Sequence, residues 1–210
     1  MKYKLRWDLT LKLGDLVLFR IERLSDGELG GWIEKESNLD QTGSSWVSED
    51  ARVFGDARVF GNAQVFGNAQ VSGNAQVSGN AWVSENAQVF GNAQVSGNAQ
   101  VSGNAWVFWD ARVFGDARVS GNAQVSGNAK IEHHSHIINI IIATKFSITI
   151  TPDNAVIGCQ LKKRSAWLKV TKQEAGYLGL PEDLFIRYRK LLKAALKLVP
   201  NRKQINSGKK

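Results

Sequence analysis

Aliphatic residues recur at every sixth position from Val47 to Ile137 and set the hydrophobic pattern of the chain. A small residue stands two positions before each of them. The unit reads A-x-V-x-G-N or A-x-V-x-G-D without a gap from Ala51 to Lys130, with Glu85 and Trp109 in place of the glycine in two units. Repetition at a fixed period dictates architecture before local propensity does. Because side chains alternate along a strand, Ala and Val should face inward and the variable positions outward.

The Gly-Asn or Gly-Asp pair that follows each short strand is typical of a corner, since these residues accept positive φ most easily. Three units of six residues then close one triangular coil. The pattern predicts a mainly β protein whose residues 45–137 form a parallel β-helix of about five coils. Asn68, Asn86, Asn104 and Asn122 should stack at one corner as a hydrogen-bonded ladder.

The two ends of the chain do not follow the repeat. Residues 1–44 predict a β cap with two strands around Gly14, and Trp32 could plug the open end of the coil. Residues 138–170 predict a β-hairpin module with a Pro-Asp-Asn turn and a further strand over 165–170. Thr171 with Glu174 forms a capping-box pattern, so residues 171–200 predict a basic helical segment. Residues 201–210 are expected to be a disordered tail.

Aromatic residues interrupt the polar outer positions of the repeat. Phe90 and Phe108 are 18 residues apart and should stack, Trp106 shares their face, and Trp109 replaces a corner glycine. One interpretation is that the outward Phe residues pack under the terminal caps. The other is that Phe90, Trp106, Phe108 and Trp109 form an exposed patch that binds a partner or another copy of the chain.

The net charge of +8 is confined to the C-terminal third, where residues 131–210 carry 15 basic and 5 acidic side chains. The predicted helix after Pro181 places basic residues beside an apolar face. Nucleic-acid phosphates would contact Arg187, Arg189, Lys190, Lys193 and Lys197. Packing of the apolar face on the hairpin, with the basic residues simply solvated, is the alternative, and a partner groove or an anionic membrane is a third.

Catalytic chemistry has few candidates in this sequence. His133, His134 and His136 lie at the end of the repeat, and neither an extruded loop nor a matching Cys or acid accompanies them. We therefore expect no catalytic residue, no metal and no cofactor. The single cysteine, Cys159, suits a reducing compartment, and no apolar run is long enough for a membrane span, so a cytoplasmic protein is expected.

The segments L-G-G-W-I-E-K-E-S-N-L (29–39), the tandem A-x-V-x-G-N units, S-I-T-I-T and I-G-C-Q (147–160) together resemble hexapeptide-repeat proteins of phages and prophages. The resemblance covers about residues 18–160 and implies left-handed coiling, trimers of the LpxA-like superfamily and a bacterial cytoplasmic setting. Proteins of this kind are often classed as acyltransferases, but no catalytic residue carries over to this chain.

These observations favour a non-enzymatic β-solenoid that binds a host protein or self-associates as a homo-oligomer. Acyl transfer, which would require one of the three histidines, is the alternative. A counter-defence inhibitor that binds a host protein or ligand, or a nucleic-acid-binding protein acting through the basic helix, completes the set of hypotheses.

Overall fold

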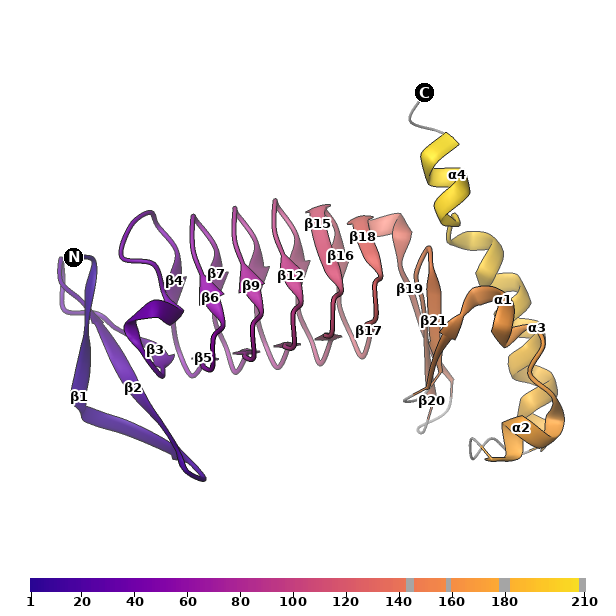
Figure 1. Ribbon diagram of the computed structural model, residues 1–210, viewed down its shortest axis with the longest axis horizontal. Helices are drawn as coiled ribbons and strands as arrows, with labels where there is room; N and C mark the ends of the chain where they lie inside the picture. The colour runs from indigo at the N-terminus through magenta and orange to yellow at the C-terminus, as the bar shows by residue number, and fades with distance from the viewer. Residues whose placement is uncertain (143–145, 158–159, 178–181, 208–210) are drawn as a thin grey trace.

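The chain is mainly β: a three-sided parallel β-solenoid lies between an N-terminal antiparallel hairpin and a small C-terminal antiparallel sheet with helices (Figure 1). The computed structural model describes residues 1–142, 146–157, 160–177 and 182–207, and their side chains except at 138, 140–142, 146–147, 182–184 and 187–188. The predicted fold class is confirmed. The left-handed sense of the coil stays a prediction from the resemblance.

Three parallel sheets form the walls of the solenoid. Sheet A contains β3 (Leu29–Ile33), β5 (Arg52–Val53), β8 (Gln70–Val71), β11 (Gln88–Val89), β14 (Trp106–Val107) and β17 (Gln124–Val125). Sheet B contains β6 (Arg58–Val59), β9 (Gln76–Val77), β12 (Gln94–Val95), β15 (Arg112–Asp116) and β18 (Lys130–His133). Sheet C contains β4 (Trp46–Val47), β7 (Gln64–Val65), β10 (Trp82–Val83), β13 (Gln100–Val101) and β16 (Arg118–Val119).

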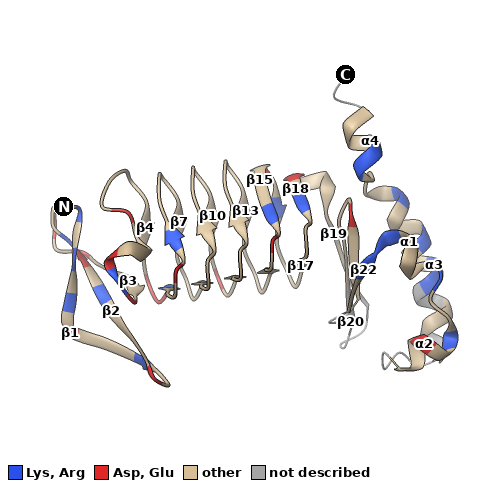
Figure 2. Cartoon of the chain, in the orientation of Figure 1, with Lys and Arg blue, Asp and Glu red and all other residues tan. Residues whose placement is uncertain are grey.

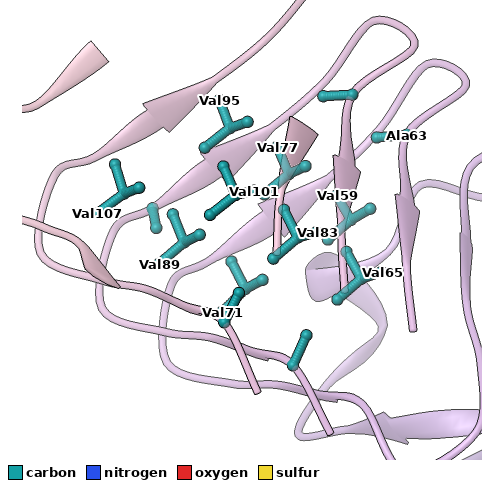
Figure 3. Close-up of a cluster of buried hydrophobic side chains, with 14 of the residues drawn as sticks. Val59, Ala63, Val65, Val71, Val77, Val83, Val89, Val95, Val101 and Val107 are labelled. Atoms are coloured by element: carbon teal, nitrogen blue, oxygen red, sulfur yellow. The ribbon is translucent and has the colours of Figure 1, made fainter. Parts of the chain in front are cut away.

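The interior of the solenoid is made of Ala and Val alone over most of its length. Val71, Val89 and Val107 form one column along sheet A, and Val residues of sheets B and C form the other two (Figure 3). Every Ala and Val of the repeat from Ala51 to Val125 is at most 1% exposed. The inward placement predicted from the alternation is therefore confirmed, and a small plus a β-branched residue per side suits the narrow triangle.

Corner residues join the walls and bond along the solenoid axis. The amide of Asn68 donates to Asn86, Asn86 to Asn104 and Asn104 to Asn122, at 3.3, 3.3 and 3.2 Å. This confirms the predicted ladder. The other two corners carry ladders of the same kind, and each ends on a carboxylate that can only accept, Asp110 in one and Asp116 in the other.

The first coil begins earlier than the six-residue period indicates. Strand β3 already pairs in parallel with β5, matching Ile33 with Val53, and Leu39 bridges Val59. Both offsets are 20 residues, whereas Trp46 and Gln64 are 18 apart, so this coil holds two extra residues between Leu39 and Trp46. The parallel stack therefore includes L-G-G-W-I, a segment predicted to belong to the cap before residue 45.

The two glycines of L-G-G-W-I permit a close approach rather than a turn. A Cβ on Gly30 would lie 2.5 Å from the Ile21 side chain and 2.6 Å from the carbonyl oxygen of Val47. A Cβ on Gly31 would lie 2.7 Å from the carbonyl oxygen of Ala51. Only glycine therefore lets β3 pack both on the hairpin and on the coil below.

The N-terminal hairpin, β1 (Tyr3–Leu13) and β2 (Leu16–Arg23), extends sheet A and covers the open end of the solenoid. Tyr3, Leu5 and Ile21 join the core cluster of the coils. The Tyr3 hydroxyl lies 2.8 Å from the carbonyl oxygen of Leu39, and burial raises its pKa well above the ordinary value. Trp32 was expected to be the plug, and this is wrong, because its ring lies on the outer face of β3 under the guanidinium of Arg20.

The C-terminal module has its own small sheet, in the order β19 (Ile138–Ile142), β20 (Phe146–Ile150), β21 (Asn154–Ile157) and β22 (Gln160–Lys163). The predicted hairpin is β20 with β21. Ile148 and Ile150 of β20 face the helices, whereas the hydroxyl of Thr149 accepts a hydrogen bond from the backbone N–H of Gln124 at 3.0 Å. Because side chains alternate in S-I-T-I-T, one face of β20 packs in a second hydrophobic core and the other face contacts the last coil.

The described residues after this sheet form four helices: α1 (Arg164–Trp167), α2 (Lys172–Tyr177), α3 (Glu182–Leu198) and α4 (Arg202–Ser207). The predicted capping box is present, since Thr171 and Glu174 exchange backbone and side-chain hydrogen bonds. The predicted strand over 165–170 is wrong because α1 turns across the sheet, where the Trp167 indole donates to the carbonyl oxygen of Ala155.

The predicted disorder of residues 201–210 is wrong for 202–207, which form α4; residues 208–210 lie outside the described residues. Arg202 holds this helix to the small sheet with a two-point ion pair to Asp153, at 2.5 and 3.1 Å, and to the last coil with a hydrogen bond to the carbonyl oxygen of Lys130. The partner carboxylate is 49 residues away in sequence, so no local pattern could indicate it.

Candidate functional site

An aromatic cluster lies on the outer face of sheet A, and its four members are those predicted from the sequence. The rings of Phe90 and Phe108 stack with centroids 5.1 Å apart and planes within 8°. Trp106 meets Phe90 edge-on at 6.1 Å, and Trp109 meets Phe108 edge-on at 5.1 Å. We call Phe90, Trp106, Phe108 and Trp109 the sheet A patch. Trp106 is 40% exposed and Trp109 53%, so the terminal caps do not bury their indoles.

Trp109 occupies a corner position with an unfavourable backbone. Its φ is 58°, in the left-handed region that glycine fills at most other corners. For a bulky residue this conformation costs about 1–2 kcal/mol. Glycine would avoid that cost, so the sequence places an indole here against the backbone preference for glycine. Such local conflicts with the fold are typical of functional positions.

A second aromatic pair lies on sheet C and was missed by the sequence prediction. Phe66 and Trp82 meet edge-on with centroids 6.2 Å apart, which is nearly the geometry of Phe90 with Trp106. The signal was present in the sequence, because both pairs place Phe 16 residues before Trp. This pair has no third ring from the next coil and no aromatic corner residue, since positions 84 and 85, which correspond to Phe108 and Trp109, are Ser and Glu.

The basic residues predicted to contact nucleic acid lie on α3, which has an apolar face and a basic face. Phe185, Leu192, Ala195 and Val199 are buried against the small sheet in the second hydrophobic cluster. Arg189, Lys190, Lys193 and Lys197 are exposed on the outside, while the side chain of Arg187 lies outside the described residues. The apolar face therefore has its partner within the chain, and Figure 2 shows the positions of Lys and Arg along the helices of this end.

The three histidines form a compact turn at the end of β18. The rings of His133 and His134 lie 3.9 Å apart between centroids, and His133 and His136 lie 6.0 Å apart. His133 accepts from the backbone N–H of Ser135, and the Nδ1 of His136 accepts from the N–H of Glu132 at 3.4 Å. His136 is 8% exposed and is therefore buried at the end of the last coil.

A cavity of about 520 Å³ beside this turn is lined by His133 and His136, by Asp116 and Glu132, and by residues around α4. The local backbone bonds orient the two Nδ1 atoms as acceptors within their own turn. In the described part of the chain, no three His, Cys, Asp or Glu side chains are placed to hold a metal ion. The local hydrogen bonds at the end of the last coil therefore account for the conformation of this turn.

Comparison with known families concerns the repeat. Six segments match the model of the YdcK β-solenoid repeat: 51–67, 69–85, 75–91, 87–103, 93–108 and 111–127. The repeats of this chain are similar to that β-solenoid repeat. The matches lie within the regular coils and leave the hairpin, the C-terminal module and the basic helix outside. No curated protein matches the chain. Among the described helices, none is long and apolar enough to span a membrane.

Proposed function

We propose that this β-solenoid is a non-catalytic binding protein that self-associates through the sheet A patch. The observation that carries the proposal is Trp109, whose side chain is kept at a corner where the backbone favours glycine. Its indole extends the Phe90–Phe108 stack to a third ring at the edge of the wall. Exposed aromatic residues that exceed what folding needs are typical of association surfaces.

A second copy of the chain is the occupant that fits this wall. The described coils between β4 and β17 repeat without an extruded loop, so sheet A offers a flat face rather than a groove for a peptide. Its rings repeat at the spacing of adjacent strands, about 4.8 Å. The same wall on another copy has the same spacing, and a two-fold axis through the patch would let each stack pack against the other.

Sedimentation velocity on the full chain tests this proposal, with two matched double variants. Trp106→Ala/Phe108→Ala removes the centre of the patch. Phe66→Ala/Trp82→Ala removes the pair of like geometry on sheet C and serves as the control. Truncating two interface aromatic residues should weaken self-association by at least about 30-fold, because central interface residues cost about 2 kcal/mol or more when truncated. The control should associate like the original chain.

Two results would contradict self-association through this face. One is a chain that stays monomeric at every concentration. The other is an equal loss of association in both variants, which would indicate general destabilisation. If a monomeric chain instead captures a host protein that the patch variant does not bind, the occupant is that protein, as the phage-type resemblance implies.

Acyl transfer is tested separately by titration with acetyl-CoA. We expect no saturable binding, and none that depends on His133 or His136. Turnover of acetyl-CoA that disappears when either histidine is replaced by Ala would overturn the non-catalytic proposal. This outcome does not depend on whether the sheet A patch mediates association.

A further inference from the structure

A broad cavity lies where the solenoid meets the C-terminal module. It encloses about 1120 Å³ between the corner at Gly127–Asn128, the turn before β21, helix α1 and the ends of α3 and α4. Four basic residues and one acidic residue line it. The basic residues are Lys163, Arg164, Arg202 and Lys203, and the acidic residue is Asp153.

The four cations divide into two that hold the fold and two that do not. The guanidinium of Arg164 donates to the carbonyl oxygens of Val199 at 2.8 Å and Pro200 at 3.3 Å, so it caps the end of α3. Arg202 is paired with Asp153. Lys163 and Lys203 are exposed, and neither ammonium group hydrogen-bonds or ion-pairs with another described residue. Their charges are available to a ligand.

The cavity continues into the basic face of α3. Leu168 forms part of its wall, and the carbonyl oxygen of this residue accepts a hydrogen bond from Arg189 at 3.2 Å. Leu196, another wall residue, directly precedes Lys197 and lies three positions after Lys193, so both lysines project from the adjoining side of the helix. At 1.5 Å per residue, Arg189 and Lys197 are about 12 Å apart along the axis.

We propose that this continuous basic surface, from Lys163 and Lys203 in the cavity to Lys193 and Lys197 on α3, binds the phosphate backbone of a nucleic acid. Positive charge spread over such a length exceeds the reach of one small anion and suits a linear polyanion. Among the described side chains of α3 from Phe185 onward there is no acidic residue to oppose it. Contacts to phosphates carry no base information, so binding should be independent of sequence.

Fluorescence anisotropy with a labelled single-stranded DNA 20-mer tests the proposal on the full chain. Four lysine–phosphate contacts on a single strand give a slope of log K against log salt of about −2.8, and hence a loss of about 50-fold between 50 and 200 mM salt. Lys163→Ala/Lys203→Ala should lower the slope to about −1.4. Both side chains are exposed and form no hydrogen bond or ion pair with the described residues, so the fold should persist by circular dichroism.

Lys12→Ala/Arg58→Ala removes two exposed charges at the N-terminal end of the molecule, in β1 and β6, and is the matched control. Its affinity and slope should stay close to those of the original chain. Binding that does not change with salt would overturn the proposal. So would equal behaviour of the two double variants, or saturable binding of pyrophosphate without binding of the oligonucleotide. The patch variant Trp106→Ala/Phe108→Ala should keep the same slope, which separates this proposal from self-association.

Discussion

Replacing Gly103 by Ala tests how the corners of the solenoid are packed. Gly103 has a φ of 69°, and a Cβ added to it would lie 2.8 Å from the backbone nitrogen of Gly121 and 2.9 Å from its carbonyl oxygen. That same oxygen accepts the inter-coil hydrogen bond from the N–H of Asn104 at 2.8 Å. The two coils cannot separate locally to make room without lengthening this bond.

Gly14 supplies the matched control, since it combines a similar φ of 62° with no atom within 4 Å of an added Cβ. Gly14→Ala should therefore cost only the left-handed backbone, about 1 kcal/mol. Gly103→Ala should cost the same amount plus overpacking of about 1–3 kcal/mol, or about 2–4 kcal/mol in total. The corners at Glu85 and Trp109 show that a Cβ is accommodated at a φ of 59° or 58°, which keeps the expected cost finite.

Urea unfolding followed by far-ultraviolet circular dichroism measures both costs as changes in the free energy of unfolding. The Gly103 variant should be less stable than the Gly14 variant by at least about 1 kcal/mol. Equal destabilisation by the two substitutions would refute the argument, because it would mean that the inter-coil contact at Gly121 does not constrain the corner.

Two other substitutions test the cap and the ladder. Tyr3→Phe removes the buried hydroxyl and should lower the free energy of unfolding by about 1–3 kcal/mol near neutral pH. The folded state raises the pKa of Tyr3 above its ordinary value of 10.0, so this contribution is complete below pH 10.0 and is lost as the pH rises further. The difference in free energy of unfolding between the original chain and the variant should therefore narrow in alkaline urea titrations. A difference that did not narrow would contradict this assignment. Asn104→Ala removes one accepted and one donated ladder bond and should cost about 1 kcal/mol by the same assay. Asn128→Ala, at a corner position without a described side-chain bond, is its control, and an equal loss in both would show that turn propensity rather than the ladder matters.

The sheet A patch illustrates how far local pattern reaches. The 18-residue spacing was enough to place Phe90 over Phe108 and Trp106 beside them, because the period fixes which residues of successive coils are neighbours. The Phe66–Trp82 pair on sheet C carries the same spacing signal, which the sequence prediction missed. The strain at Trp109 follows from its place in a glycine corner.

The basic surface, in contrast, could be predicted only in part from the sequence. The sequence indicated a helix with a basic face, and the exposed Arg189, Lys190, Lys193 and Lys197 agree with it. It did not show that Lys163 and Lys203 line the same cavity, because the segments of α1, α2 and α3 separate them in the sequence. It also did not distinguish the cations that bind carbonyl oxygens or Asp153 from those that are unengaged.

The sequence by itself determined the solenoid, its inward Ala and Val columns, its Asn ladder and the aromatic stack, because a fixed period converts positions along the chain into neighbours in space. Only the tertiary structure decided where the coil begins, what covers its ends and how the basic residues are used. The close packing at Gly30 and Gly31, the hydrogen bond of the buried Tyr3 to Leu39 and the Arg202–Asp153 ion pair each join segments whose separation follows no period. Such contacts depend on how the non-repeating segments fit against the ends of the solenoid, which the repeat does not specify.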